Sequence, residues 1–231
     1  MKVGIVIFPG SNCDQDAIYA FHEQFGCETV KLWHKEHDLQ GCDLIFLPGG
    51  FSYGDYLRSG AIARFAPIMQ NIIQFAAKGG LVWGVCNGFQ ILCESQLLPG
   101  ALLHNHNQKF NCKNVFVKPV TTNSAISGLL DIHQAYQIPV AHGEGRFYCD
   151  DSTLSELIAN DQILFTYCDA QGNITDNANV NGSLNNIAGI CNAKRNVFGM
   201  MPHPERAVDS QLYNTDGRKL FESVLSLSLA R

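Results

Sequence analysis

The chain has 231 residues, of which 46% are hydrophobic and 16% are charged, and its formal net charge is −5. This length and this apolar content predict one sizeable α/β domain spanning residues 1–231, with no linker that would divide it. The acidic balance and the lack of any Lys/Arg cluster argue against binding to nucleic acid or to an anionic membrane surface.

The cysteines and the N-terminus indicate the compartment. The nine cysteines are odd in number and contain no C-x-x-C pair, so neither a disulfide framework nor a zinc site is expected. Residues 1–8 enter a strand without a basic leader, and no apolar run is long enough to cross a bilayer. We therefore expect a cytoplasmic protein with reduced thiols.

In the first half of the chain, apolar strands alternate with helical or mixed segments. Strands are expected at Lys2–Phe8, Glu28–Trp33, Cys42–Leu47 and Leu81–Val85. Helices are expected from Asp14 or Asp16 to Phe25, over Gly60–Lys78, and from Asn87 to Cys93. This alternation predicts a parallel, doubly wound sheet. In such sheets ligands bind beyond the carboxyl ends of the strands, where Gly10, Gly50 and Cys86 fall.

After residue 100 the pattern changes to strands separated by turns. These strands are expected at Asn111–Val120, Ala135–Ala141, Gln162–Cys168, Ile187–Cys191 and Asn196–Met201. Two helices are expected at Thr153–Asn160 and Gly217–Leu229. We interpret most of this half as antiparallel strands added to the sheet. The segment Asp169–Asn186, rich in Asn, Gly and Asp, is predicted to be a surface loop or long hairpin without a role in the chemistry.

The segment Gly84-Val85-Cys86-Asn87-Gly88-Phe89-Gln90 has the pattern of a nucleophile elbow. Glycines two places before and two places after Cys86 permit a sharp turn that lifts its side chain above the end of the sheet. The following helix presents free N–H groups that favour a thiolate and an oxyanion. A buried core cysteine between packing glycines is the alternative interpretation.

A nucleophilic thiol needs a base and a group that orients the base, and the chain offers two His-x-Glu pairs. In an extended segment, side chains two residues apart project to the same side. Prolines on both sides of His203 stiffen the backbone, so His203 with Glu205 is favoured over His142 with Glu144. The glycines around His142 suit a substrate loop better. Either pair could instead belong to an exposed turn without a role.

The segment Gly49–Gly60 is the third element of the expected site. A Gly-Gly pair at a strand end can aim the N–H of Gly50 at a ligand, and the N–H of Asn87 would complete an oxyanion hole. Asp55 and Arg58 fit two roles equally well: they either contact the ammonium and carboxylate of a substrate or form an ion pair that fixes the loop.

Cofactor motifs are absent from the sequence. No Walker phosphate-binding motif occurs, so ATP chemistry is not expected on this chain. The spacing of His104 and His106 would suit a metal, but without neighbouring ligands a polar loop is the better interpretation. We predict no cofactor and no metal on this chain.

Four motifs extend the pattern. They are Pro9-Gly10-Ser11-Asn12-Cys13-Asp14, the run from Pro48 to Arg58, Ala141-His142-Gly143-Glu144-Gly145-Arg146-Phe147, and Gly199-Met200-Met201-Pro202-His203-Pro204-Glu205-Arg206. With the elbow, they resemble the class I (triad) glutamine amidotransferases, and among these the glutaminase subunits of phosphoribosylformylglycinamidine synthase. The resemblance runs from about Val3 to the last helix. It implies a three-layer, flavodoxin-like domain with a mostly parallel central sheet and added antiparallel strands.

The resemblance also implies residue roles. Cys86 would be the nucleophile, His203 the general acid and base, and Glu205 the residue that orients His203. Gly50 and Asn87 would be the oxyanion donors. Gln90 would help to hold the glutamine substrate. Because of the loops that carry them, Arg58 and His142 are expected as further substrate contacts.

The resemblance implies an activity and partners as well. The chain would hydrolyse L-glutamine to glutamate and ammonia through a thioester on Cys86. The ammonia would pass to a separate synthetase subunit that uses ATP and Mg²⁺ to convert formylglycinamide ribonucleotide to its amidine in purine synthesis. A small subunit would bridge the two. The residues alone leave two alternatives open: a cysteine hydrolase or peptidase on the same framework, or a non-catalytic redox-sensing module.

Overall fold

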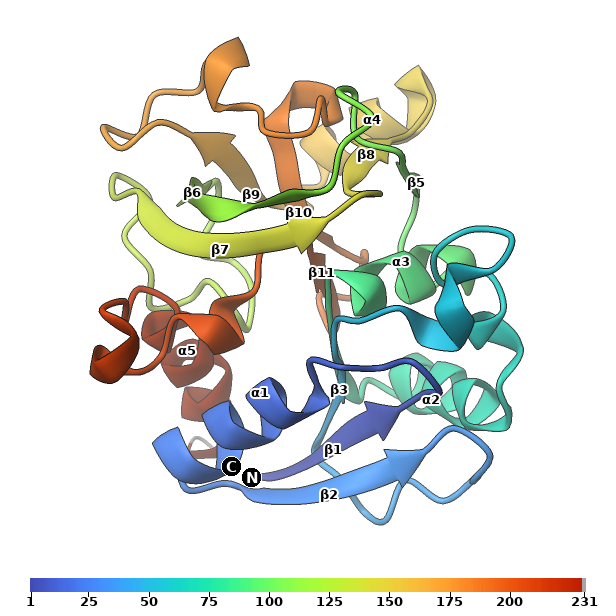
Figure 1. Ribbon diagram of the computed structural model, residues 1–231. Helices are drawn as coiled ribbons and strands as arrows, with labels where there is room; N and C mark the ends of the chain where they lie inside the picture. Colours follow the sequence, from blue (N-terminus) through green and yellow to red (C-terminus); the bar gives the residue numbers. More distant parts are fainter. Residues whose placement is uncertain (230–231) are drawn as a thin grey trace.

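The computed structural model describes residues 1–229. Within this part of the chain, a nine-stranded sheet runs through the domain (Figure 1). In spatial order the strands are β2 (Glu28–Trp33), β1 (Lys2–Ile7), β3 (Leu44–Leu47), β4 (Leu81–Val85), β11 (Val197–Met200), β10 (Ile187–Cys191), β9 (Ile163–Cys168), β6 (Asn111–Pro119) and β7 (Tyr136–His142). A separate two-stranded sheet pairs β5 (Ala101–Leu103) with β8 (Arg146–Tyr148).

The sheet has a parallel half and an antiparallel half. Strands β2, β1, β3, β4 and β11 pair in parallel. From β11 onward, β10, β9, β6 and β7 pair antiparallel. The predicted combination of a parallel sheet with added antiparallel strands is therefore confirmed. Strand β4 lies between β3 and β11, so its carboxyl end at Val85 has a parallel strand on each side.

Helices cover both faces of the parallel strands. Figure 1 shows α1 (Asp14–Ile18) and α5 (Arg218–Leu229) on one face, with α2 (Pro67–Ala77) and α3 (Asn87–Glu94) on the other. The domain therefore has the expected three layers. Helix α4 (Asp151–Ala159) follows the short strand β8, and none of the helices described is long and apolar enough to cross a membrane.

Aromatic side chains join the layers below the site. The rings of Phe46 on β3 and Trp83 on β4 meet edge to face at 5.4 Å. Phe221 of α5 lies 5.1 Å from Trp83 and 4.8 Å from Phe21. Such ring contacts stabilise the fold beyond the effect of the apolar area that these residues bury. Strands β3 and β4 are therefore firmly held where they meet the site.

Two predicted helices have different boundaries in the structure. The helix expected over Gly60–Lys78 begins only at Pro67, after a short 3₁₀ turn at Ala63–Phe65. Ala66 is extended, with ψ 141°, because a residue before proline avoids the helical region, while proline itself suits the first helical turn. The helix expected to reach Phe25 changes from α to π geometry at Tyr19.

The prediction for Asp169–Asn186 is wrong in one respect. The segment contains no strand, but Asn181, Ser183 and Asn186 are buried. The side-chain amide of Asn181 donates to Gly145 O at 2.7 Å. Ser183 accepts from the backbone N–H of Phe147 at 3.0 Å. This loop therefore supports the segment that follows β7, a contact between distant segments that composition alone does not reveal.

Candidate active site

The structure contains the predicted strand–turn–helix junction at Cys86. Its backbone is left-handed, with φ 51° and ψ −108°, between β4 and α3. A β-carbon on Gly88 would lie 1.9 Å from the carbonyl oxygen of Leu47, and one on Gly84 would lie 2.6 Å from Leu92 Cδ1. Only glycines fit at these contacts, so both are required by the close approach of α3 to the sheet. A strained, non-glycine backbone of this kind is typical of functional sites.

His203 and Glu205 form the predicted pair. Nδ1 of His203 lies 2.7 Å from Oε1 of Glu205, and their side chains are 1% and 0% exposed. The contact does not come from an extended segment, however. Pro204 starts a 3₁₀ turn, and the backbone N–H of His203 donates to Pro139 O at 2.8 Å, which attaches this turn to β7.

The environment of His203 favours its protonated form. Burial opposes a charge on the ring, but the negative charge of Glu205, then that of Cys86, outweighs it and raises the pKa of His203 well above its ordinary value. Gly49 allows the two side chains to approach each other. A β-carbon there would lie 2.6 Å from His203 Cε1 and 3.4 Å from Cys86 Cβ.

The second His-x-Glu pair is not a pair in the structure. His142 Nδ1 lies 3.0 Å from Asn105 Oδ1 rather than on Glu144. Asn105 donates its own N–H groups to the carbonyls of Lys109 and His142, both at 2.8 Å, so its oxygen is the acceptor for the ring. Burial, then the charge on His203, lowers the pKa of His142 to about 4, which keeps this ring neutral.

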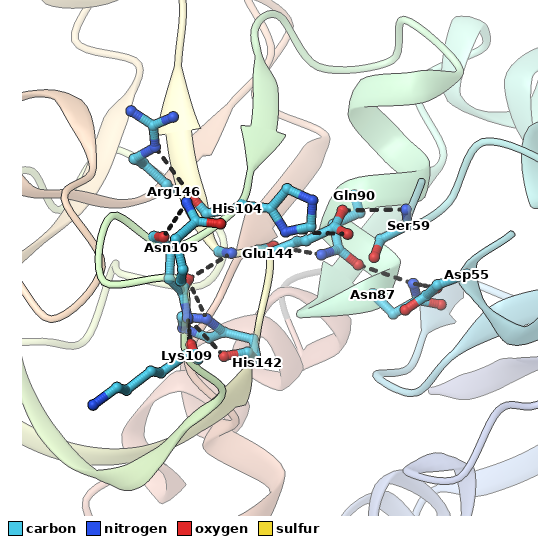
Figure 2. Close-up of polar contacts among 12 residues, drawn as sticks. Asp55, Ser59, Asn87, Gln90, His104, Asn105, Lys109, His142, Glu144 and Arg146 are labelled. Atoms are coloured by element: carbon cyan, nitrogen blue, oxygen red, sulfur yellow. Dashed lines mark hydrogen bonds and ion pairs between the residues drawn. The ribbon is translucent and has the colours of Figure 1, made fainter. Parts of the chain in front are cut away.

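Asn87 joins the nucleophile helix to the loop after β3. Its side-chain oxygen accepts from the backbone N–H of Ser52 at 3.1 Å. Its N–H groups donate to Asp55 Oδ1 at 3.3 Å and to Gln90 Oε1 at 2.9 Å. Gln90 donates in turn to the backbone carbonyl of Glu144 (Figure 2). The elbow helix therefore holds two loops that are distant in sequence.

The structure places Arg58 away from this group. Its Nε and one Nη donate to Glu94 at 2.6 and 2.9 Å, and its side chain is 61% exposed, whereas that of Glu94 is 9% exposed. Of the two roles open for Arg58, the structure gives it an ion pair, with Glu94 rather than with Asp55. We therefore leave Arg58 out of the proposed substrate contacts.

Cys13 is a neighbour of the site that the sequence did not reveal. Arg206 donates to Cys13 Sγ at 3.1 Å and to Asp16 at 2.8 Å. The ligand atoms of Cys13, His203 and Glu205 lie within 4.8 Å of one another, as in a metal site. The positive charge of Arg206 beside the sulfur and the bond between His203 and Glu205 both oppose a cation there. The absence of a metal stays a prediction.

A small cavity of about 190 Å³ opens beside Cys86. Its walls come from the loop after β3, the start of α3, the segment between β5 and β6, and the end of β7 with the loop that follows it. The lining residues are Gly50, Phe51, Asp55, Ser59, Cys86, Gln90, His104, Phe110, Ala141, His142, Gly143 and Glu144. Sites for drug-sized ligands measure about 300–1,000 Å³, so this cavity suits a smaller molecule.

Comparison with known proteins assigns the family. Residues 1–223 match the model of the CobB/CobQ-like glutamine amidotransferase domain. The chain belongs to this family. Among its curated relatives, phosphoribosylformylglycinamidine synthase subunit PurQ of Koribacter versatilis is 53% identical over all of both chains. PurQ of Thermosynechococcus vestitus is also 53% identical, over 99% of this chain and 97% of its own.

Solved structures of amidotransferases have the same fold. A chain of the PurLQS structure from Thermotoga maritima superposes with a TM-score of 0.86 at 40% identity, covering 98% of both chains. Another glutamine amidotransferase from Thermotoga maritima superposes with a TM-score of 0.55 at 16% identity, covering 98% of this chain and 83% of its own. The second match supports the fold alone. The resemblance to glutamine amidotransferases seen in the sequence is therefore confirmed.

Asp55 gives this site a pH-dependent effect on stability. Burial, together with the charge of Glu144, raises the pKa of Asp55 from 3.8 to about 6. Because the folded state disfavours the carboxylate, the contribution of Asp55 to stability is greatest below pH 3.8 and is lost as the pH rises through about 6. In Asp55→Asn this loss is absent. From about pH 4 to pH 7, the unfolding free energy of the variant should therefore rise by about 1–2 kcal/mol relative to wild type.

Urea unfolding of both proteins across this range measures that difference. The exposed Asp38→Asn variant is the matched control and should follow wild type. A difference between Asp55→Asn and wild type that stays constant with pH would contradict the raised pKa of Asp55.

Proposed function

We propose that this chain is the glutaminase subunit of a phosphoribosylformylglycinamidine synthase and that Cys86 is its nucleophile. One observation carries the assignment of the site: in a glutamine amidotransferase chain, an elbow cysteine lies beside a buried His203–Glu205 pair and a cavity of about 190 Å³. The relatives that match over nearly their whole length are named as subunits of phosphoribosylformylglycinamidine synthase, which supports the synthase to which the ammonia would be supplied.

In the proposed reaction, the thiolate of Cys86 attacks the side-chain carbonyl carbon of glutamine. A carbon–sulfur bond forms and the carbonyl becomes a tetrahedral oxyanion. As the oxyanion collapses, the carbon–nitrogen bond breaks, and protonated His203 gives its proton to the leaving nitrogen, which departs as ammonia. Water then adds to the γ-glutamyl thioester and gives its proton to His203, and glutamate leaves as the thiolate re-forms.

The other residues have roles in this proposal. The backbone N–H groups of Gly50 and Asn87 would bind the oxyanion; Gly50 lines the cavity, and Asn87 begins α3 directly after Cys86. Glu205 would hold the imidazole of His203 in position for both proton transfers. His142 and Gln90 would contact glutamine from the cavity wall.

The partners belong to the same proposal. Ammonia would pass to a synthetase subunit that uses ATP and Mg²⁺ on formylglycinamide ribonucleotide, with a small subunit bridging the two. A chain 40% identical to this one occurs in the PurLQS structure, and this supports a multi-subunit assembly. A cytoplasmic location stays a prediction from the sequence.

Glutamine turnover by the chain alone and after addition of its partner subunits tests the function. We expect glutamate and ammonia in equal amounts, slowly from the isolated chain and faster in the complex during amidine synthesis, because release of unused ammonia would be wasteful. The control is the complex supplied with ammonium instead of glutamine. Absence of glutamate release in the complex, with hydrolysis of peptides by the chain, would instead support the cysteine peptidase.

A further inference from the structure

Two carboxylates face the cavity from opposite loops. Asp55 comes from the loop after β3 and Glu144 from the loop after β7 (Figure 2). Both line the cavity beside Cys86. The protein holds part of each group: Asp55 Oδ1 accepts from Asn87, and Glu144 Oε2 accepts from the backbone N–H of Ser59, both at 3.3 Å.

These carboxylates lack a strong cationic partner among the described residues. The nearby Arg58 binds Glu94 instead. His104 Nδ1 lies 3.6 Å from Glu144 Oε1, but its ring is 69% exposed, so solvent screens this contact. Burial, with the charge of Glu144, raises the pKa of Asp55 to about 6, so its carboxylate form is disfavoured in this loop. A cationic ligand bound to both carboxylates would offset this penalty.

The position of the pair relative to Cys86 is fixed by α3. Asn87, the residue after the nucleophile, holds Asp55 and also binds Ser52 on the same loop. Gln90, one turn further along α3, holds the backbone of Glu144. Any ligand that binds both carboxylates is therefore placed at a set distance from the sulfur.

The loop that carries Asp55 is strained. Tyr53, Asp55 and Leu57 have φ angles of 54°, 53° and 72°, a region that residues other than glycine rarely adopt. Strain of this kind persists where the surrounding contacts enforce it, and it is concentrated at ligand sites. Here the contacts of Asn87 enforce the conformation that turns Asp55 toward the cavity.

We infer that Asp55 and Glu144 together bind the α-ammonium group of glutamine and make the site selective for a free amino acid. This inference rests on the proposed glutaminase function and specifies its substrate recognition. An ammonium group has three N–H donors and no acceptor, which matches two carboxylates. Hydrogen bonds between charged partners are about twice as strong as neutral ones. A glutamine side chain within a peptide has no such ammonium and would be rejected.

Glutaramate, which is glutamine without its amino group, tests the pair. In the complex with the partner subunits, wild type should prefer glutamine over glutaramate in kcat/KM by at least about 100-fold. Asp55→Asn and Glu144→Gln should each reduce this preference by about 10- to 100-fold, because each removes one charged hydrogen bond. The matched control is Glu156→Gln, an exposed carboxylate on α4, which should keep the wild-type preference.

Comparing the two substrates distinguishes loss of ammonium binding from general damage to the site. If a variant loses activity toward glutamine and glutaramate equally, so that the preference is unchanged, the inferred role is wrong. A wild-type complex that hydrolyses both substrates equally well would also overturn it, while leaving the glutaminase function intact. Failure of wild type to hydrolyse either substrate would overturn the proposed function itself. Asp55→Asn keeps the oxygen that accepts from Asn87, so it provides a second test if Glu144→Gln does not fold.

Discussion

Replacing Cys86 with serine is expected to lower glutamine-dependent amidine synthesis by the complex by about 10⁴-fold or more. A serine hydroxyl at this position has no low-energy ionised form, whereas a thiolate beside protonated His203 is stabilised by the ring. Ammonium-dependent synthesis should be unaffected, because added ammonia bypasses the thioester. Steady-state assays with each nitrogen source measure both activities.

Cys112→Ser is the matched control for this variant. All nine cysteines are free thiols, and Cys112 is the exposed one. It lies on β6, and its removal should leave both activities within about twofold of wild type. Retention of glutamine-dependent synthesis by Cys86→Ser would remove Cys86 from the reaction. Loss of the ammonium-dependent activity as well would show that the serine variant disrupts the complex rather than the chemistry.

Replacing His203 with glutamine is expected to reduce glutamine-dependent activity by about 10²–10⁴-fold, the usual contribution of a general acid or base. His203 has two functions in the proposal, since it stabilises the Cys86 thiolate and protonates the leaving ammonia. Glu205→Gln keeps the shape of the side chain but removes the charge that raises the pKa of His203. We expect it to lower the activity less than His203→Gln does.

Alkylation of Cys86 by iodoacetamide distinguishes this role of His203 from a packing role. The thiolate is the reactive form, so at one pH Cys86 should be alkylated more slowly in His203→Gln than in wild type, because a neutral amide cannot stabilise the anion. Equal alkylation rates in wild type and variant would show that His203 does not assist the Cys86 thiolate. Thermal unfolding of the same samples shows whether the buried substitution also reduces stability.

The layout of the sheet could be predicted because its strands are continuous apolar runs. β2 and β4 have the predicted boundaries, and the change to antiparallel pairing follows β11 as the turn-rich second half suggested. The start of α2 could not be predicted from apolar spacing, because the proline at position 67 overrides it. The pair β5–β8 was missed since three-residue strands carry too little periodicity to detect.

In the site, too, local features could be predicted and contacts between distant segments could not. Cys86, His203 and Glu205 could be identified because local features mark them: glycines around the cysteine and prolines around the histidine. Contacts between distant segments were beyond such reasoning. Asn105 carries no local signal of its bond to His142, and nothing around Cys13, the residue before α1, marks its contact with Arg206. The two-residue spacing suggested a pair between His142 and Glu144. It could not show that Glu144 instead meets the loop that carries Ser59.

The intact mass of the chain, quenched with acid while glutamine is being consumed, tests whether Cys86 is the nucleophile. We expect a γ-glutamyl adduct that maps to the peptide containing Cys86, disappears after glutamine is exhausted and is missing in Cys86→Ser. The Cys112→Ser variant should carry the adduct as wild type does. An adduct on another cysteine, or glutamine turnover that continues in Cys86→Ser, would contradict this assignment.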